Sequence, residues 1–124
     1  TMEKTMMENV GIFRNGAGIA SAHRELKSLR EAYGETGIGD SSRRFNTELQ
    51  QALELGNLLD CALLTAATAL NRTESRGGHC REDHPERDDA RWLKHSFARL
   101  VDGDVAIDYK QVDITKWKPK PRTY

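Results

Sequence analysis

The residues with the clearest capacity for chemistry gather in the second half of the chain. His79, Cys80 and His84 lie close together, and His95 follows a little further on. Imidazole nitrogen and thiolate sulfur are the usual zinc ligands, but common zinc patterns pair two cysteines at short spacing, and only one cysteine is local here. We therefore predict that this chain holds no metal.

Ser75, His79 and Asp83 have the side-chain types of a hydrolase triad. A nucleophilic serine of that kind is flanked by glycines on a sharp strand-to-helix turn, and no such pattern surrounds Ser75. The chain also lacks the G-x-G-x-x-G and G-x-x-x-x-G-K-S/T patterns whose backbone amides bind phosphate groups. The residues alone therefore predict no catalytic apparatus and no cofactor in this chain, which we expect to be inactive by itself.

Composition limits the class of partner. The chain has 124 residues with 19 basic and 19 acidic side chains, which argues against a nucleic-acid-binding protein because such proteins carry a basic excess. Charged residues make up 31% and the mean hydropathy is −0.71. No apolar run comes near the roughly 20 residues of a membrane helix, so we predict no membrane insertion. Two cysteines are too few for a disulfide framework, and we expect reduced thiols in a cytoplasmic protein.

One long pattern organises the chain. Residues 47–72 repeat apolar side chains at helical spacing, which predicts a helix of about 40 Å with Asn46 as its N-cap. A helix that is apolar over most of its circumference must be covered on several sides, so we expect the other elements to surround it. Gly56 predicts a close helix crossing. Asp60 predicts a buried or half-buried carboxylate paired with an arginine, with a catalytic role as the alternative.

Two shorter helices are predicted before it, over residues 1 to about 14 and about 18 to 33, with a glycine-rich loop at 34–44. One face of the first helix carries Met2, Met6, Val10 and Phe13. The second forms a packing seam from Ile19, Ala22, Leu26, Leu29 and Tyr33. Because helical periodicity is present from residue 1, we expect further polypeptide to precede it.

The C-terminal part has a different character. Residues 92–101 and 105–112 predict a β-hairpin that turns at Asp102-Gly103, with Phe97 in the same alternation as the apolar residues of the second strand. The predicted fold is one mainly α domain, a three-helix bundle with a long central helix. Its parts are the helical bundle (1–76), a charged docking loop (77–91), a small C-terminal β-hairpin (92–112) and an extended basic tail (113–124).

Residues 72–95, RTESRGGHCREDHPERDDARWLKH, resemble a known family. The C-terminal domain of the flavoprotein subunit of succinate dehydrogenase and fumarate reductase carries E-S-R-G-A/G-H-x-R-E-D-x-P-x-R-D-D followed by W-x-K-H. ENVGIFRNG at 8–16, FNTEL at 45–49, LELGNLL at 53–59 and the closing KPKPRTY also resemble this family. The similarity covers essentially the whole chain, although L-aspartate oxidase shares parts of the motif.

The resemblance implies a three-helix bundle followed by a small extended region. It also implies that the whole subunit interconverts succinate and fumarate on FAD, passes electrons to an iron–sulfur subunit, and lies in the cytoplasm on the inner face of the membrane. In this family the flavin-binding glycine loop, the histidine that tethers FAD and the substrate-binding residues lie upstream of this region. No catalytic and no cofactor residue is therefore carried over, and FAD is expected in the parent subunit.

We expect the charged segment to hold the domain on the flavin-binding domain of the same subunit. Arginine forks and carboxylates can pair across such an interface, and two glycines allow close backbone approach. The predicted docking residues are Arg76, His79, Arg81, Asp83, Arg87, Asp88, Asp89 and Trp92. The alternatives are an internal network, in which Arg76 and Asp83 pair beneath the hairpin, and direct chemistry.

A second class of function remains open, a free-standing helical adaptor module without a redox role. Under the first hypothesis, an isolated piece exposes an apolar or charged face near Arg76 and Trp92, which is then available for homo-oligomer contacts.

Overall fold

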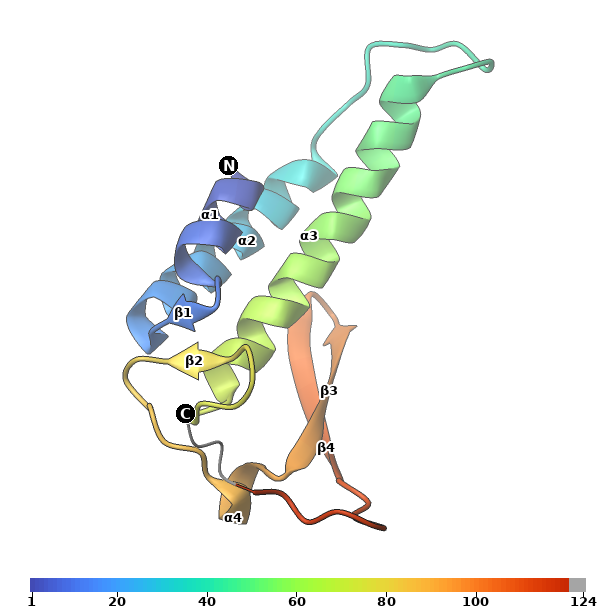
Figure 1. Cartoon of the computed structure of the whole chain (residues 1–124). Helices are drawn as coiled ribbons and strands as arrows, with labels where there is room; N and C mark the ends of the chain where they lie inside the picture. Colours follow the sequence, from blue (N-terminus) through green and yellow to red (C-terminus); the bar gives the residue numbers. More distant parts are fainter. Residues whose placement is uncertain (121–124) are drawn as a thin grey trace.

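The computed structural model describes residues 1–120 (Figure 1). Its elements, in chain order, are α1 (Met2–Asn9), β1 (Phe13–Arg14), α2 (Gly16–Gly34), α3 (Thr47–Asn71), β2 (Cys80–Arg81), α4 (Asp89–Trp92), β3 (Lys94–Val101) and β4 (Asp104–Gln111). The mainly α prediction is confirmed, with α1, α2 and α3 forming the bundle and β3 and β4 forming the hairpin.

Three local predictions for α3 are confirmed. The side chain of Asn46 accepts a hydrogen bond from the Leu49 amide at 2.8 Å, which caps the helix. Tyr33 of α2 lies against Gly56 and donates to the carbonyl oxygen of Ala52 at 2.8 Å, so the two helices cross closely where the side chain is smallest. Asp60 pairs with Arg30 of α2.

The core lies around the C-terminal half of α3, between α1, α2 and the hairpin (Figure 1). Ile19 and Leu26 of α2 and Leu63 of α3 are its largest fully buried apolar side chains. Leu100 of β3 and Val105 of β4 pack against this cluster from the hairpin side. Burial of these side chains is the main source of stability, at about 25 cal/mol for each Å² of apolar surface removed from water.

The prediction that α3 is covered on several sides is wrong for its N-terminal half. Leu49, Leu53, Leu55 and Leu58 each leave between 40% and 59% of their surface exposed. Figure 1 gives the reason, because α1, most of α2 and the hairpin lie beside the C-terminal half of α3. Only the C-terminal end of α2, with Tyr33, reaches the N-terminal half. The expectation about apolar runs also needs correction, since α3 is long and apolar enough to cross a membrane by length and composition. Core helices of soluble proteins meet the same criterion.

The first helix is shorter than predicted. It ends at Asn9, and Phe13–Arg14 instead forms a short parallel pairing with Cys80–Arg81. Phe13 is consequently exposed rather than on the buried face with Val10. The pairing joins residues far apart in the sequence, so helical periodicity near the N-terminus cannot reveal it.

The hairpin turn is confirmed at Asp102 and Gly103, both with positive φ (51° and 84°), as two-residue turns of the I′ type require. The first strand begins later than predicted, at Lys94, because residues 89–92 form α4. Phe97 lies opposite Asp108 and is exposed, so its predicted place in the inward alternation is wrong.

The tail is connected to the charged loop. Residues 112–120 form no helix or strand, and the Lys120 carbonyl accepts a hydrogen bond from Arg87 Nη1 at 2.8 Å. The last four residues of the predicted tail lie outside the described part of the chain.

Candidate functional site

The charged loop is organised around Glu74, whose side chain is fully buried. Its carboxylate accepts from Arg72 Nη1 at 2.7 Å, from Arg76 Nε at 2.8 Å and Nη2 at 3.0 Å, and from the Asp88 amide at 2.8 Å. Burial opposes ionisation, but these hydrogen bonds outweigh it and hold the pKa of Glu74 below its usual value. The carboxylate is therefore ionised and fixed in place.

Arg81 and Asp83 form a second centre that ties two helices together. Arg81 is only 2% exposed, and it donates to Asp83 through Nε and Nη2, both at 2.8 Å. Asp83 Oδ2 also accepts from the amide of Gly16, at the N-terminus of α2, at 2.9 Å. Arg81 Nη1 donates at 3.1 Å to the carbonyl oxygens at the end of α3, those of Ala69, Leu70 and Arg72.

Four further charged side chains of the loop, those of Arg87, Asp88, Asp89 and Arg91, also pair within the chain. Asp89 accepts from Arg76 Nη2 at 2.6 Å and from Arg87 Nη2 at 2.8 Å. Asp88 caps α4 through the Arg91 amide and pairs with the Arg91 side chain at 2.6 Å. The pairing of Arg76 with Asp83, considered from the sequence, is wrong, because Arg76 bonds to Glu74 and Asp89 instead.

Trp92 lies inside this assembly rather than on its surface, with 8% of its area exposed. The Arg72 guanidinium and the Lys94 ammonium each lie 5.0 Å from the centre of its ring, an arrangement typical of cation–π contacts. Within residues 1–120, its indole Nε1 is buried without a hydrogen-bond partner. Of the predicted docking residues, Arg81 and Trp92 are therefore already covered by this chain.

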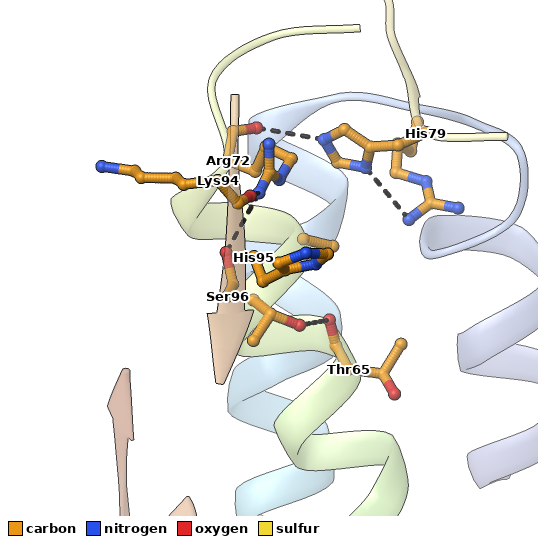
Figure 2. Close-up of a pocket in the computed structure, with 9 residues that line it drawn as sticks. Thr65, Arg72, His79, Lys94, His95 and Ser96 are labelled. Carbon is orange, nitrogen blue, oxygen red and sulfur yellow. Dashed lines mark hydrogen bonds between the residues drawn. The ribbon is translucent and has the colours of Figure 1, made fainter. Parts of the chain in front are cut away.

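A pocket of about 360 Å³ lies between β1, the end of α3, the loop and β3 (Figure 2). Its lining residues are Arg14, Thr65, Thr68, Ala69, Arg72, His79, Lys94, His95 and Ser96. His79 Nε2 lies 3.0 Å from the carbonyl oxygen of Arg72, and Nδ1 lies 3.4 Å from Nη1 of Arg14. Figure 2 shows the Lys94 side chain pointing away from both histidines, in keeping with its place over the Tyr109 ring.

The candidate catalytic and metal-ligating residues do not form a reactive site. Ser75 accepts from the amide of Arg81 at 2.8 Å and its hydroxyl lies 2.8 Å from the carbonyl oxygen of His84, so it holds the loop together. Across residues 1–120 there is no group of three or more His, Cys, Asp and Glu side chains placed to hold a metal. Both cysteines are free thiols.

The structure also bears on FAD. The diphosphate of a nucleotide cofactor commonly binds free amides at a helix N-terminus. At the N-terminus of α2 the amide of Gly16 is bound to Asp83 and that of Gly18 to Asn15. A Cβ on Gly16 would lie 2.9 Å from the Asp83 carboxylate, so that space is filled by the chain itself. These residues do not fit an FAD diphosphate.

Two features of the site were missed from the sequence. Glu74 was expected only as part of a motif, although it is the buried centre of the network. Arg14 was not expected near the loop at all, because only the parallel pairing with Arg81 brings it there. The sequence motif that contains Glu74 could have indicated its central role. No pattern near Arg14 indicates that this residue lies beside the loop.

Comparison with known proteins agrees with the sequence motif. The chain is 43% identical over 124 residues to a fumarate reductase flavoprotein subunit of Mycobacterium tuberculosis, covering 99% of this chain and 21% of that protein. It is 40% identical over 115 residues to the succinate dehydrogenase flavoprotein subunit of Rickettsia felis, covering 92% and 19%. The fold matches an FrdA chain of Escherichia coli quinol fumarate reductase with a TM-score of 0.91 and 38% identity, over 95% and 21% of the two chains.

The chain thus spans about a fifth of the length of the relatives it matches. The family model described as the C-terminal region of fumarate reductase flavoproteins matches residues 1–124. This chain belongs to the family of C-terminal domains of succinate dehydrogenase and fumarate reductase flavoprotein subunits.

Proposed function

We propose that this chain is the supporting domain of a flavoprotein subunit that interconverts succinate and fumarate on FAD and passes electrons to an iron–sulfur subunit. The observation that carries the proposal is that nearly the whole chain matches about a fifth of such subunits, in sequence and in fold. The flavin and the substrate belong to the other four fifths. The chain's own contribution is to bind that larger part and keep it in shape.

The docking surface is the loop at 77–91 together with the residues that anchor it. Arg76, Arg87 and Asp89 are only half-buried and form a connected set, so they present a fixed pattern of charge to a neighbour. The buried Glu74 holds this pattern, because it fixes Arg76 on one side and the backbone of Asp88 on the other. A rigid polar surface loses less entropy on binding than a mobile one.

Apolar surface supports the same role. The leucines along the N-terminal half of α3 are exposed, as are Met7, Ile12 and Phe13 around the end of α1. Monomeric soluble proteins seldom leave large contiguous apolar patches in water, and such patches usually mark binding sites. In the complete subunit this surface is covered by the flavin-binding domain and, at the periphery, by partner subunits on the cytoplasmic face of the membrane.

The test is association between two separately produced polypeptides, this chain and the flavin-binding portion of the Mycobacterium tuberculosis relative. Sedimentation velocity should show a one-to-one complex. The Arg76→Ala variant should bind at least tenfold more weakly, whereas Arg24→Ala, which changes an exposed arginine of α2, should bind as the unchanged chain does.

Urea unfolding of each variant separates docking from internal support. If Arg76→Ala folds normally but binds weakly, the docking role of Arg76 stands. If it unfolds the chain, Arg76 serves the internal network instead. Absence of any complex with the unchanged chain favours the free-standing adaptor. FAD added to the chain alone should leave no bound yellow chromophore, and retained FAD would overturn the assignment of the flavin to the larger part.

A further inference from the structure

Arg14 differs from the arginines of the neighbouring loop. Carboxylates pair with each arginine of that loop and of the segment leading into it, namely Arg72, Arg76, Arg81, Arg87 and Arg91. Arg14 is half-buried, yet within residues 1–120 no carboxylate lies within ion-pair distance of it. Its guanidinium donates through Nε to the carbonyl oxygen of Gly11 and lies beside His79. A half-buried charge loses part of its hydration, and a carboxylate partner would offset that loss.

Among residues 1–120, no aspartate or glutamate lines the pocket of about 360 Å³ that contains Arg14. Burial and then the charge of Arg81 lower the pKa of Arg14, the reverse of what a carboxylate neighbour does. Burial likewise lowers the pKa of His79, and three nearby arginines lower it further. The pocket is therefore cationic in a chain whose net charge is zero.

The donors that remain are suited to one chemical group. The carbonyl oxygen of Arg72 accepts a hydrogen bond from Nε2–H of His79, so neutral His79 offers Nδ1 to Arg14 as an acceptor. Within residues 1–120, Arg14 uses Nε to bond the Gly11 carbonyl and Nη1 to contact His79. Nη2 and the outer N–H of Nη1 have no partner there. Two parallel N–H groups of that kind match the two oxygens of a carboxylate. His95 and Ser96 also line the pocket (Figure 2).

We propose that the pocket of Arg14, His79 and His95 receives an aspartate or glutamate side chain from the flavin-binding part of the same subunit. This rests on the proposed function, since the larger part of the subunit supplies the carboxylate. Charge complementarity is the argument for the occupant, because within residues 1–120 no carboxylate pairs with Arg14, and the pocket of about 360 Å³ is large enough to admit a side chain. The contact anchors β1 and the loop together and aligns the domain on its neighbour.

Acetate is the probe for the pocket, added to the chain at constant ionic strength in exchange for chloride. Nuclear magnetic resonance signals of Arg14 Nε–H and of the His79 ring should shift and saturate. The Arg14→Gln variant should lose the saturable shift of His79. Arg24→Gln, on an exposed part of α2, should keep it. Arg14→Lys preserves charge without the fork and should bind acetate several-fold more weakly.

Absence of a saturable shift in the unchanged chain, or an equal shift in Arg14→Gln, would overturn the proposal. If Arg14→Gln fails to fold, His95→Ala, which changes an exposed side chain, takes its place and should weaken acetate binding. Succinate is a second probe. If it binds more than tenfold more tightly than acetate, the pocket takes a small dicarboxylate, and the proposed source is wrong.

The two-polypeptide association separates this proposal from the proposed function. Arg14→Gln should weaken the complex at least tenfold, and unchanged association would show that the carboxylate does not come from the flavin-binding part. If the unchanged chain forms no complex, the proposed function fails. The acetate titration then still decides whether the pocket binds a carboxylate, because it uses this chain alone.

Discussion

Arg81 and Asp83 form a two-bond ion pair in which each partner also caps a different helix. The Asp83 carboxylate accepts a hydrogen bond from the amide of Gly16, the first residue of α2. The Arg81 guanidinium donates hydrogen bonds to the carbonyl oxygens at the end of α3. The positive N-terminal end of one helix and the negative C-terminal end of the other thus meet charges of opposite sign. Two residues of a loop without hydrophobic periodicity therefore hold the bundle together.

Removing the buried cation tests this arrangement. We expect Arg81→Ala to lower the free energy of unfolding by about 2–3 kcal/mol, because it removes the contacts of a buried guanidinium to three carbonyl oxygens and to Asp83, whose carboxylate is 39% exposed. Urea unfolding monitored by circular dichroism measures the change. Arg24→Ala, on the exposed face of α2, should change stability by no more than about 0.5 kcal/mol. Equal effects of the two substitutions would contradict the capping role.

Acid should destabilise the chain through the same carboxylates. Hydrogen bonds from Arg81 hold the pKa of Asp83 well below its usual range, and the pKa of Glu74 is also lowered. As pH falls, these carboxyl groups therefore take up protons in the unfolded chain before they do so in the folded chain. Their contribution to the free energy of unfolding is complete above about pH 5 and is lost as pH falls through and below the ordinary carboxyl pKa of about 4. Urea midpoints at pH 7, 5, 4 and 3 should decline in that order below pH 5. Asp83→Asn should flatten the decline, and a midpoint unchanged between pH 5 and pH 3 would refute the assignment.

The crossing of α2 and α3 makes a prediction opposite to helix propensity. Alanine normally favours a helix over glycine by about 1 kcal/mol. A Cβ on Gly56 would, however, lie 2.9 Å from the Tyr33 ring, so Gly56→Ala should destabilise the chain. Gly34→Ala is the control, because its Cβ meets nothing within 4 Å. Thermal unfolding of both variants measures the difference, and a Gly56→Ala variant more stable than the parent would mean that the helices do not meet there.

Particular elements show how much of the structure can be predicted from the sequence. The N-cap Asn46, the Asp60 partner, the Gly56 crossing and the Asp102-Gly103 turn are predictable, because each depends on a few neighbouring residues and simple geometry. The β1–β2 pairing is not, because a two-residue parallel contact between distant segments leaves no periodic trace. It moves Phe13 to the surface and Arg14 into the pocket.

The pattern of charge pairs was equally out of reach. The loop is rich in both signs, so many pairings are compatible with the sequence, and only the path of the backbone selects among them. Arg76 bonds to Glu74 and Asp89, and Asp83 bonds to Arg81. The hydrophobic pattern of α3 also led to a wrong prediction of burial. In sequence, leucines that stay exposed in this domain cannot be told from leucines that another element covers.

The pKa of His79 reports on the pocket. Burial is the main cause of its lowered value, and Arg14 is the first of the charges that lower it further. Arg14→Gln removes that charge, so the pKa of His79 should rise, as followed by resonance shifts of the ring across pH 5–8. His23, on the α2 surface, is the internal reference and should not change. A fall in the pKa of His79 would contradict the proximity of Arg14.

Transplantation tests the central claim most directly. The region of the Mycobacterium tuberculosis flavoprotein subunit that matches this chain, 43% identical over 124 residues, is replaced by the chain itself. FAD content and succinate–fumarate turnover are then compared with those of the parent and of a subunit truncated at the same point. A domain that supports the flavin-binding part should restore both toward the parent values. A chimera no better than the truncated subunit in FAD retention and turnover would contradict the account.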